Sequence, residues 1–118
     1  MNNFRKLQVY QKGLLLSRDV RKAKNDFPKR ELFSLTSQFQ RAVDSIVLNI
    51  AEGAGTRSNK EFAKFLDYAI RSAHECIGCL DIALENKYTT EQQHKYLFEQ
   101  IDEIIAMLIG FQRTIIKD

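Results

Sequence analysis

The sequence has few of the residues that interrupt helices or cross-link small folds. Its 118 residues include one proline, five glycines and two cysteines. A disordered chain is poor in apolar residues, which make up 44% of this one. Two cysteines do not make a disulfide framework. We therefore expect one compact helical domain over residues 1–118, large enough to bury a core without a metal or a disulfide.

Long hydrophobic runs are also missing. No uninterrupted apolar segment approaches the ~20 residues that a membrane span needs. The N-terminal segment MNNFRKLQVYQK has no apolar core of the kind found in a secretory signal. These absences predict a soluble cytoplasmic protein that makes no membrane contact.

Hydrophobic periodicity predicts four helices, at about residues 3–25, 29–52, 58–85 and 90–116. Pro28 ends the first, and Gly53 is a good C-terminal glycine for the second. The sequence SNKE at 58–61 is a capping box that opens the third helix, and Thr89 or Thr90 opens the fourth. Long helices joined by short loops favour an all-α fold, the antiparallel up-down-up-down four-helix bundle.

The second predicted helix has two different faces. Its core stripe comprises Leu35, Phe39, Ala42, Val43, Ile46 and Ile50. A second line, the polar ridge, comprises Gln38, Arg41, Ser45, Asn49 and Glu52. Ser and Asn are poor helix-interior residues because their side chains compete for the backbone. The ridge is therefore expected to form a hydrogen-bond network, a subunit contact or a ligand contact. We favour a structural role, in which it holds the following turn and a subunit seam.

Apolar residues outside the core stripes predict an oligomer. Leu7, Tyr10 and Leu14 lie nearly opposite the main stripe of the first helix. Leu48 and Ile82 lie outside the stripes of the second and third helices. A single bundle needs only one buried stripe per helix, so these residues indicate contacts between subunits. The alternative is that they are ordinary isolated surface residues.

Positive charge is concentrated at the start of the chain. Residues 1–30 hold nine Lys or Arg and two Asp, whereas residues 31–118 hold nine basic and thirteen acidic residues. Such asymmetry indicates a polyanionic partner. The alternative is that the basic helix faces acidic patches on neighbouring helices or subunits.

The predicted nucleic-acid-binding residues are Arg5, Lys12, Arg18, Arg21, Lys22, Arg57, Lys60 and Lys64. Their contacts are expected to be with phosphates, so binding is salt-sensitive and weakly sequence-specific. No aromatic-rich surface indicates base stacking. On the third helix, Asp67 is spaced to pair with Lys64 and Arg71, and the competing interpretation is a solvated surface with internal salt bridges.

The sequence offers no convincing catalytic centre. Cys76 and Cys79 form C-x-x-C within a helix, whereas reactive pairs lie at a helix N-terminus. Zinc needs two further ligands, and His74 projects to the other side of the helix. The turn GAGTRS at 53–58 lacks the strand and the Gly-Lys ending of a nucleotide-binding loop, although it leads into a helix N-terminus that favours anions. We therefore expect no catalytic residue, no metal, no cofactor and no enzymatic activity.

Short motifs along the whole chain resemble those of one known family. They are Leu7-Gln8-Val9-Tyr10, Phe27-Pro28, Glu31, Leu35-Thr36, Gln38, Arg41-Ala42, Ser45-Ile46, Asn49-Ile50-Ala51-Glu52-Gly53, Gly55, Arg57-Ser58, Lys60-Glu61-Phe62, Ser72 and Glu75. On these motifs the chain resembles the four-helix-bundle proteins encoded in intervening sequences of bacterial 23S rRNA genes, to which accessory proteins of diversity-generating retroelements are similar. It departs at Thr56, Val47 and Arg71, where the family usually has Arg, Pro and a small residue.

The resemblance implies a ring-like homopentamer. It also implies structured RNA or an RNA–DNA hybrid as the ligand, alongside a reverse transcriptase or ribosomal RNA. Together with the charge pattern, it predicts a non-enzymatic oligomeric bundle that binds nucleic acid through basic surfaces. The alternative is a protein-interaction scaffold whose basic first helix docks an acidic partner.

Overall fold

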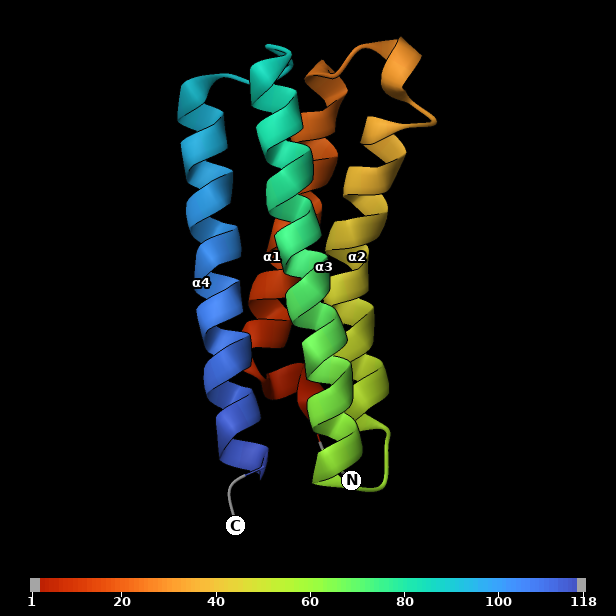
Figure 1. The fold of residues 1–118 in the computed structure, drawn as a ribbon, viewed down its shortest axis with the longest axis vertical. Helices are drawn as coiled ribbons and strands as arrows, with labels where there is room; N and C mark the ends of the chain where they lie inside the picture. Colours follow the sequence, from red (N-terminus) through yellow and green to blue (C-terminus); the bar gives the residue numbers. More distant parts are fainter. Residues whose placement is uncertain (1–2, 117–118) are drawn as a thin grey trace.

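Four long helices form an antiparallel all-α bundle in the computed structural model, which describes residues 3–116 (Figure 1). They are α1 (Gln8–Ala23), α2 (Leu35–Ala54), α3 (Asn59–Glu85) and α4 (Glu91–Ile116). Three short 3-10 helices are η1 (Phe4–Lys6), η2 (Lys24–Asp26) and η3 (Lys29–Glu31). Each long helix packs against two others, in the order α1, α2, α3, α4 and back to α1. The predicted fold class is confirmed, and the bundle measures 47 × 24 × 20 Å.

The first helix is shorter than predicted at both ends, and the second begins later than predicted. Leu7 has extended backbone angles, which separate η1 from α1, and α1 ends at Ala23 where the tighter turn of η2 follows. The second helix begins at Leu35 rather than at 29, because the preceding segment forms η3 and then a turn. Leu32 and Phe33 in that turn are exposed, so no core contact draws them into the helix.

The prediction that Gly53 is the C-terminal glycine of the second helix is wrong. Gly53 lies inside α2, and the helix ends at the next residue, Ala54, with Gly55 as its C-terminal cap. A side chain at Gly53 has no room, because an added Cβ would lie 2.7 Å from Phe62 Cδ1 and 2.8 Å from Phe65 Cβ. This glycine therefore permits the close approach of α2 and α3 next to their connecting turn.

The starts of α3 and α4 follow the predicted capping pattern. Ser58 Oγ accepts a hydrogen bond from the Glu61 amide at 3.1 Å. Thr90 Oγ1 accepts one from the Gln93 amide, also at 3.1 Å. Each hydroxyl satisfies an amide that has no partner within its own helix. Of the two threonines proposed for the fourth helix, Thr90 is therefore the cap.

The core runs between all four helices, and the six residues of the predicted α2 stripe are all buried. Leu14, Leu48 and Ile82 are exposed, as expected for residues outside the stripes. Leu7 and Tyr10 differ from the prediction, since both are partly buried against the core. No helix within residues 3–116 has the length and apolar character needed to cross a bilayer.

Candidate nucleic-acid interface

The basic residues of α1 do not share one surface. Lys12 Nζ lies 2.5 Å from Glu103 Oε1 of α4, whereas Arg21 lies against Asp44 of α2. These two cations therefore face different neighbouring helices, and each has an acidic partner within the molecule. The interpretation in which basic residues of the first helix meet acidic groups on neighbouring helices holds for this pair.

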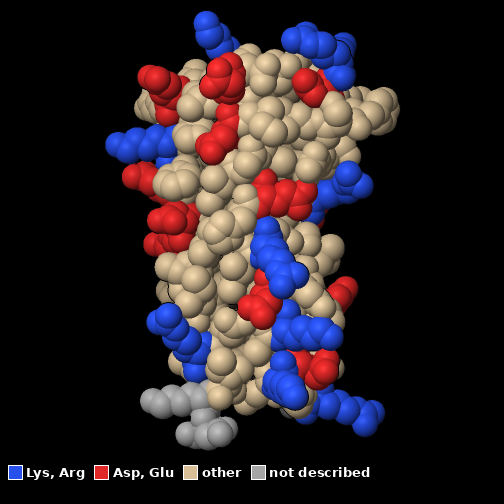
Figure 2. Space-filling view, in the orientation of Figure 1, with Lys and Arg blue, Asp and Glu red and all other residues tan. Residues whose placement is uncertain are grey.

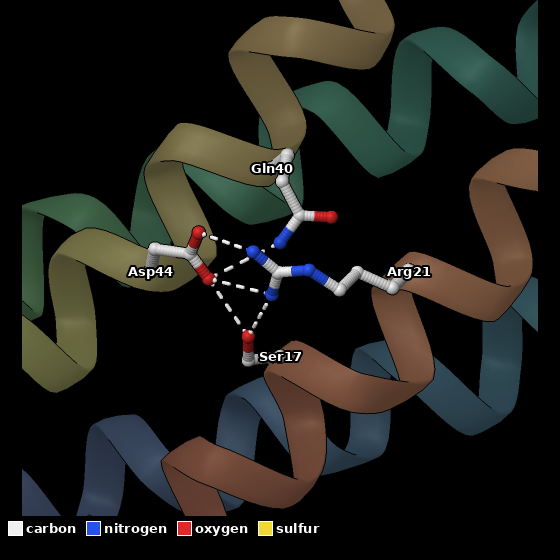
Figure 3. A network of polar contacts seen from close by, with 4 residues as sticks. All are labelled: Ser17, Arg21, Gln40 and Asp44. Atoms are coloured by element: carbon white, nitrogen blue, oxygen red, sulfur yellow. Dashed lines mark hydrogen bonds and ion pairs between the residues drawn. The ribbon is translucent and has the colours of Figure 1, made fainter.

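Asp44 is the centre of a polar network between α1 and α2 (Figure 3). It accepts hydrogen bonds from Ser17 at 2.7 Å, from Gln40 at 3.1 Å and from both terminal nitrogens of Arg21 at 3.0 and 2.9 Å. Partial burial opposes ionisation of Asp44. It is outweighed by the hydrogen bonds from Arg21, by those from Ser17 and Gln40 and by the charge of Arg21, so the pKa of Asp44 lies below its ordinary value. Hydrogen bonding to Asp44 and the negative charge of Asp44 raise the pKa of Arg21 despite slight desolvation.

Arg5, Arg18 and Lys22 remain exposed to solvent. Arg18 makes only a long contact, with its Nε 4.0 Å from Asp19 Oδ1. Among residues 3–116, Arg5 and Lys22 form no ion pair within the 4.0 Å limit. These three side chains are the members of the predicted N-terminal set that are accessible to a phosphate.

A second group of cations meets at the end of the bundle that carries the α2–α3 turn. Phe4 of η1 lines a hollow of about 510 Å³ together with Arg57, Ser58 and Phe62, so η1 lies beside the start of α3. Its neighbours along the chain, Arg5 and Lys6, therefore join the exposed side chains Arg57, Lys60 and Lys64 at this end. We name these five residues the basic end. On the face shown in Figure 2, several blue side chains lie toward the lower end, where Figure 1 places this turn, and others lie at the upper end.

The predicted salt bridges on α3 are replaced by other contacts. Asp67 Oδ1 accepts a hydrogen bond from Gln112 of α4 at 2.7 Å. Arg71 lies over the Tyr68 ring, with its guanidinium carbon 6.0 Å from the ring centre. Within the described part of the chain, Asp67 forms no ion pair with either Lys64 or Arg71. Lys64 therefore keeps its charge available at the basic end.

Part of the polar ridge joins α2 to α3. Ser72 Oγ donates to Ser45 Oγ at 2.8 Å, and Asn49 Nδ2 donates to the Ser45 carbonyl and hydroxyl at 2.8 and 2.9 Å. About two turns nearer the start of α2, Gln38 Nε2 donates to Glu75 Oε2 at 3.1 Å. These bonds run along the seam between two helices of the same chain.

The other two ridge residues, Arg41 and Glu52, are exposed. Neither forms an ion pair within residues 3–116. The turn after the ridge is held by a separate bond, in which Thr56 Oγ1 donates to the Gly53 carbonyl at 2.6 Å.

The two cysteines are buried free thiols. Burial raises the pKa of Cys76 far above its ordinary value and raises that of Cys79 to about 11, with a smaller contribution from Glu75. Thiols in such surroundings are poor nucleophiles. Among residues 3–116, no three His, Cys, Asp or Glu side chains are grouped so as to hold a metal ion. The thiols therefore serve as packing groups of α3.

The sequence alone did not identify Asp44 or Lys6. Asp44 is an isolated acid on the second helix, and its partners lie on another helix, so no spacing within α2 reveals the network. Lys6 was indistinguishable from other N-terminal cations until η1 was placed beside the α2–α3 turn. Only the proximity of segments far apart in the chain distinguishes these residues.

Comparison with known proteins agrees with this architecture. Residues 5–110 match a family model described as 23S rRNA-intervening sequence protein. A solved structure from Bacteroides thetaiotaomicron, described as a protein of unknown function from the S23 ribosomal protein family, superposes with a TM-score of 0.80 at 27% identity. The match covers 88% of this chain and 97% of that one. No curated protein matches significantly. Since the family model covers most of the sequence, the chain belongs to the family of 23S rRNA-intervening sequence proteins.

Proposed function

We propose that this protein is a non-enzymatic oligomeric bundle that binds structured RNA or an RNA–DNA hybrid through phosphate contacts. The observation that carries the proposal is the basic end, which brings η1 and the start of α3 together. Five cations, Arg5, Lys6, Arg57, Lys60 and Lys64, gather there, and they outnumber the nearby exposed acids Glu52, Glu61 and Asp67. A local excess of positive charge attracts phosphates and releases their counterions.

Repetition of the basic end around a ring strengthens its field. Leu14 and Leu48 are exposed, and with Val47 they form the apolar part of a hollow of about 190 Å³ between α1 and α2, whose lining also includes Ser17 and Asp44. This surface supports a contact with other copies of the chain, and the family resemblance supports a homopentamer. A reverse transcriptase is the proposed protein partner by similarity to the accessory proteins of diversity-generating retroelements.

The proposal is tested by light-scattering mass and fluorescence anisotropy with a structured RNA over a salt series. The expected result is a pentamer that gains RNA mass at low salt and loses it steeply as salt rises. In the Lys60→Gln/Lys64→Gln variant, the log–log slope of affinity against salt should fall in magnitude by about 1.4–1.8, because each of the two lost phosphate contacts contributes about 0.7–0.9.

A matched control separates local from general charge effects. The Lys87→Gln/Lys95→Gln variant removes the same charge from the opposite end of the bundle, where the α3–α4 turn lies. Its salt slope should equal that of the original protein. Equal losses in both variants would show that net charge, rather than the basic end, governs binding, and an oligomer that ignores RNA at all salts rejects the proposal.

The alternative function is a protein-interaction scaffold, and the exposed apolar residues Leu14 and Leu48 favour it. In that case the exposed cations of α1 dock an acidic protein. Charge reversal at Arg18 and Lys22 then disrupts a protein complex and leaves nucleic-acid affinity unchanged.

A further inference from the structure

A hollow of about 310 Å³ lies where the segment before α2 meets the end of α1. We name it the Phe33 groove, and its lining includes Lys24, Leu32, Phe33, Thr36, Gln40 and Arg41. A second hollow of about 190 Å³ adjoins it, shares Lys24, Leu32 and Thr36, and adds Lys29. This region lies away from the basic end, near the opposite end of the bundle (Figure 1).

Two buried oxygens in the groove have no hydrogen-bond partner. Thr36 is only 6% exposed, and its Oγ1 is unpaired within the described chain, as is the buried Oε1 of Gln40. The orientation of the Gln40 amide is set by chemistry, because its Nε2 donates to the Asp44 carboxylate, which can only accept. Figure 3 shows Oε1 turned away from Asp44. An unpaired buried polar atom is unfavourable, so a ligand that supplies an N–H or O–H donor gains from binding here.

The charges that line the groove are all positive. Lys24, Lys29 and Arg41 line the two hollows, and within residues 3–116 none of them forms an ion pair. The nearby carboxylate of Glu31 accepts hydrogen bonds from Ser34 and Tyr88, and it does not line either hollow. The groove is therefore complementary to an anion.

Phe33 adds a free aromatic face. It is 93% exposed, the highest value among the large hydrophobic residues exposed in the described chain. A phenyl ring in that position has little contact with its own fold, and hence little role in stability. Aromatic rings presented beside cations are the platform on which proteins stack unpaired bases.

We propose that the Phe33 groove binds one unpaired nucleotide of an RNA. The base stacks on Phe33, the phosphate lies among Lys24, Lys29 and Arg41, and Gln40 Oε1 accepts a hydrogen bond from a base amino group or a ribose hydroxyl. Because that oxygen is buried in the free protein, binding includes a side-chain rearrangement that uncovers it. The inference rests on the proposed RNA function and gives it a preference for unpaired bases, which the basic end alone does not have.

The test compares two RNAs with the same stem, a blunt duplex and a hairpin with an unpaired loop. The original protein should bind the hairpin more tightly. Phe33→Ala should lower hairpin affinity by about 5- to 150-fold, the size of one base–aromatic stack, and leave duplex affinity unchanged. Phe33→Tyr, which keeps an aromatic face, should retain the preference. Phe98→Ala, which removes a partly exposed ring from α4, is the matched control and should change neither affinity.

A second measurement distinguishes the failure of this inference from failure of the proposed function. Adenosine 5′-monophosphate is titrated into the labelled protein and followed by NMR, with inorganic phosphate as the comparison ligand. We expect the nucleotide to shift the Phe33 and Gln40 resonances and phosphate to leave the Phe33 ring unchanged. Equal affinity for duplex and hairpin, with no nucleotide shift at Phe33, rejects the groove while RNA binding stands. A nucleotide shift at Phe33 without duplex binding supports the groove and rejects the basic end.

The groove also has a competing occupant, a second copy of the chain. If Phe33→Ala lowers the oligomeric mass in the absence of RNA, the ring is a subunit contact and the inference is wrong. Unchanged mass with weakened hairpin binding supports the nucleotide site.

Discussion

Arg21 of α1 donates to both carboxylate oxygens of Asp44 of α2, with Nη1 to Oδ1 at 3.0 Å and Nη2 to Oδ2 at 2.9 Å. A planar guanidinium fits a carboxylate in this two-point geometry, which makes the contact directional as well as charged. Ser17 and Gln40 also donate to Asp44, so its oxygens are well satisfied. A cation held in this way is poorly placed to contact RNA, even though its side chain is half exposed.

Replacement of Asp44 by Asn should destabilise the fold and free Arg21. Hydrogen bonds to charged groups contribute about 1.5–3 kcal/mol each to stability, but this pair is partly solvated, so the expected loss in the free energy of unfolding is about 1–2 kcal/mol. Urea denaturation measures the loss. Asp102→Asn, which removes an exposed acid from α4, is the control and should stay within about 0.5 kcal/mol. Equal stabilities of the two variants would contradict a structural role for the network.

The Arg21–Asp44 pair makes the stability of the fold depend on pH in the acidic range. The pKa of Asp44 is lowered in the folded protein, so its contribution is fully present above the unfolded value of about 3.9 and is lost as the pH falls through the folded value. The stability difference between the original protein and Asp44→Asn should therefore be constant near neutral pH and shrink below about pH 4. Urea midpoints taken between pH 7 and pH 2 measure this convergence. Parallel curves down to pH 2 would show that Asp44 titrates normally.

Gly53→Ala should destabilise the protein although Gly53 lies within a helix. Alanine normally favours a helix over glycine by about 1 kcal/mol, but here the added methyl meets Phe62 and Phe65 at less than 3.0 Å. Such overpacking costs about 1–3 kcal/mol, so a net loss in thermal stability is expected. Gly78→Ala is the matched control, because nothing lies within 4 Å of its Cβ position, and it should raise stability.

Gly53 and Gly78 differ in a way that local sequence patterns do not predict. Hydrophobic periodicity and capping motifs depend on residues that are close together in the chain. The buried stripes and the caps Ser58 and Thr90 can therefore be predicted from the sequence alone. Glycine is common at the C-terminal ends of helices, and the pattern therefore predicts a helix end at Gly53. Its actual role depends on two phenylalanines of the next helix, which no local pattern can place.

The candidate site could not be predicted in full for the same reason, since the partners of its residues lie on other helices. The N-terminal cations are indistinguishable in sequence, yet Lys12 and Arg21 of α1 pair with acids on α4 and α2. Arg5 instead belongs to η1, whose Phe4 lies beside the start of α3. The sequence pattern also does not predict that α2 begins as late as Leu35. Apolar residues before Leu35 extend its helical pattern, and only their exposure shows that they lie outside the helix.

The seam between α2 and α3 provides a test of the polar ridge. Asn49→Ala removes both hydrogen bonds to Ser45 and should lower stability by about 0.5–1.5 kcal/mol, the usual net value of such a bond. Ser72→Ala removes the bond across the seam. The double variant should lose an amount different from the sum, since both residues contact the same hydroxyl. If Asn49→Ala remains fully stable and oligomeric yet loses RNA binding, the ridge contacts a ligand instead.

The buried thiols should resist modification in the folded protein. Only the thiolate reacts with iodoacetamide, and burial raises the pKa of Cys79 to about 11 and that of Cys76 still higher. At pH 8, less than about 1% of either thiol is therefore ionised, and access to both is blocked by the core. We expect alkylation, followed by mass spectrometry, to be more than about tenfold slower than in urea-unfolded protein, where thiols titrate near 8.5. Rapid modification of one cysteine under native conditions would mean that α3 opens locally. In that case, if the thiols serve only as packing groups, addition of RNA should leave the modification rate unchanged.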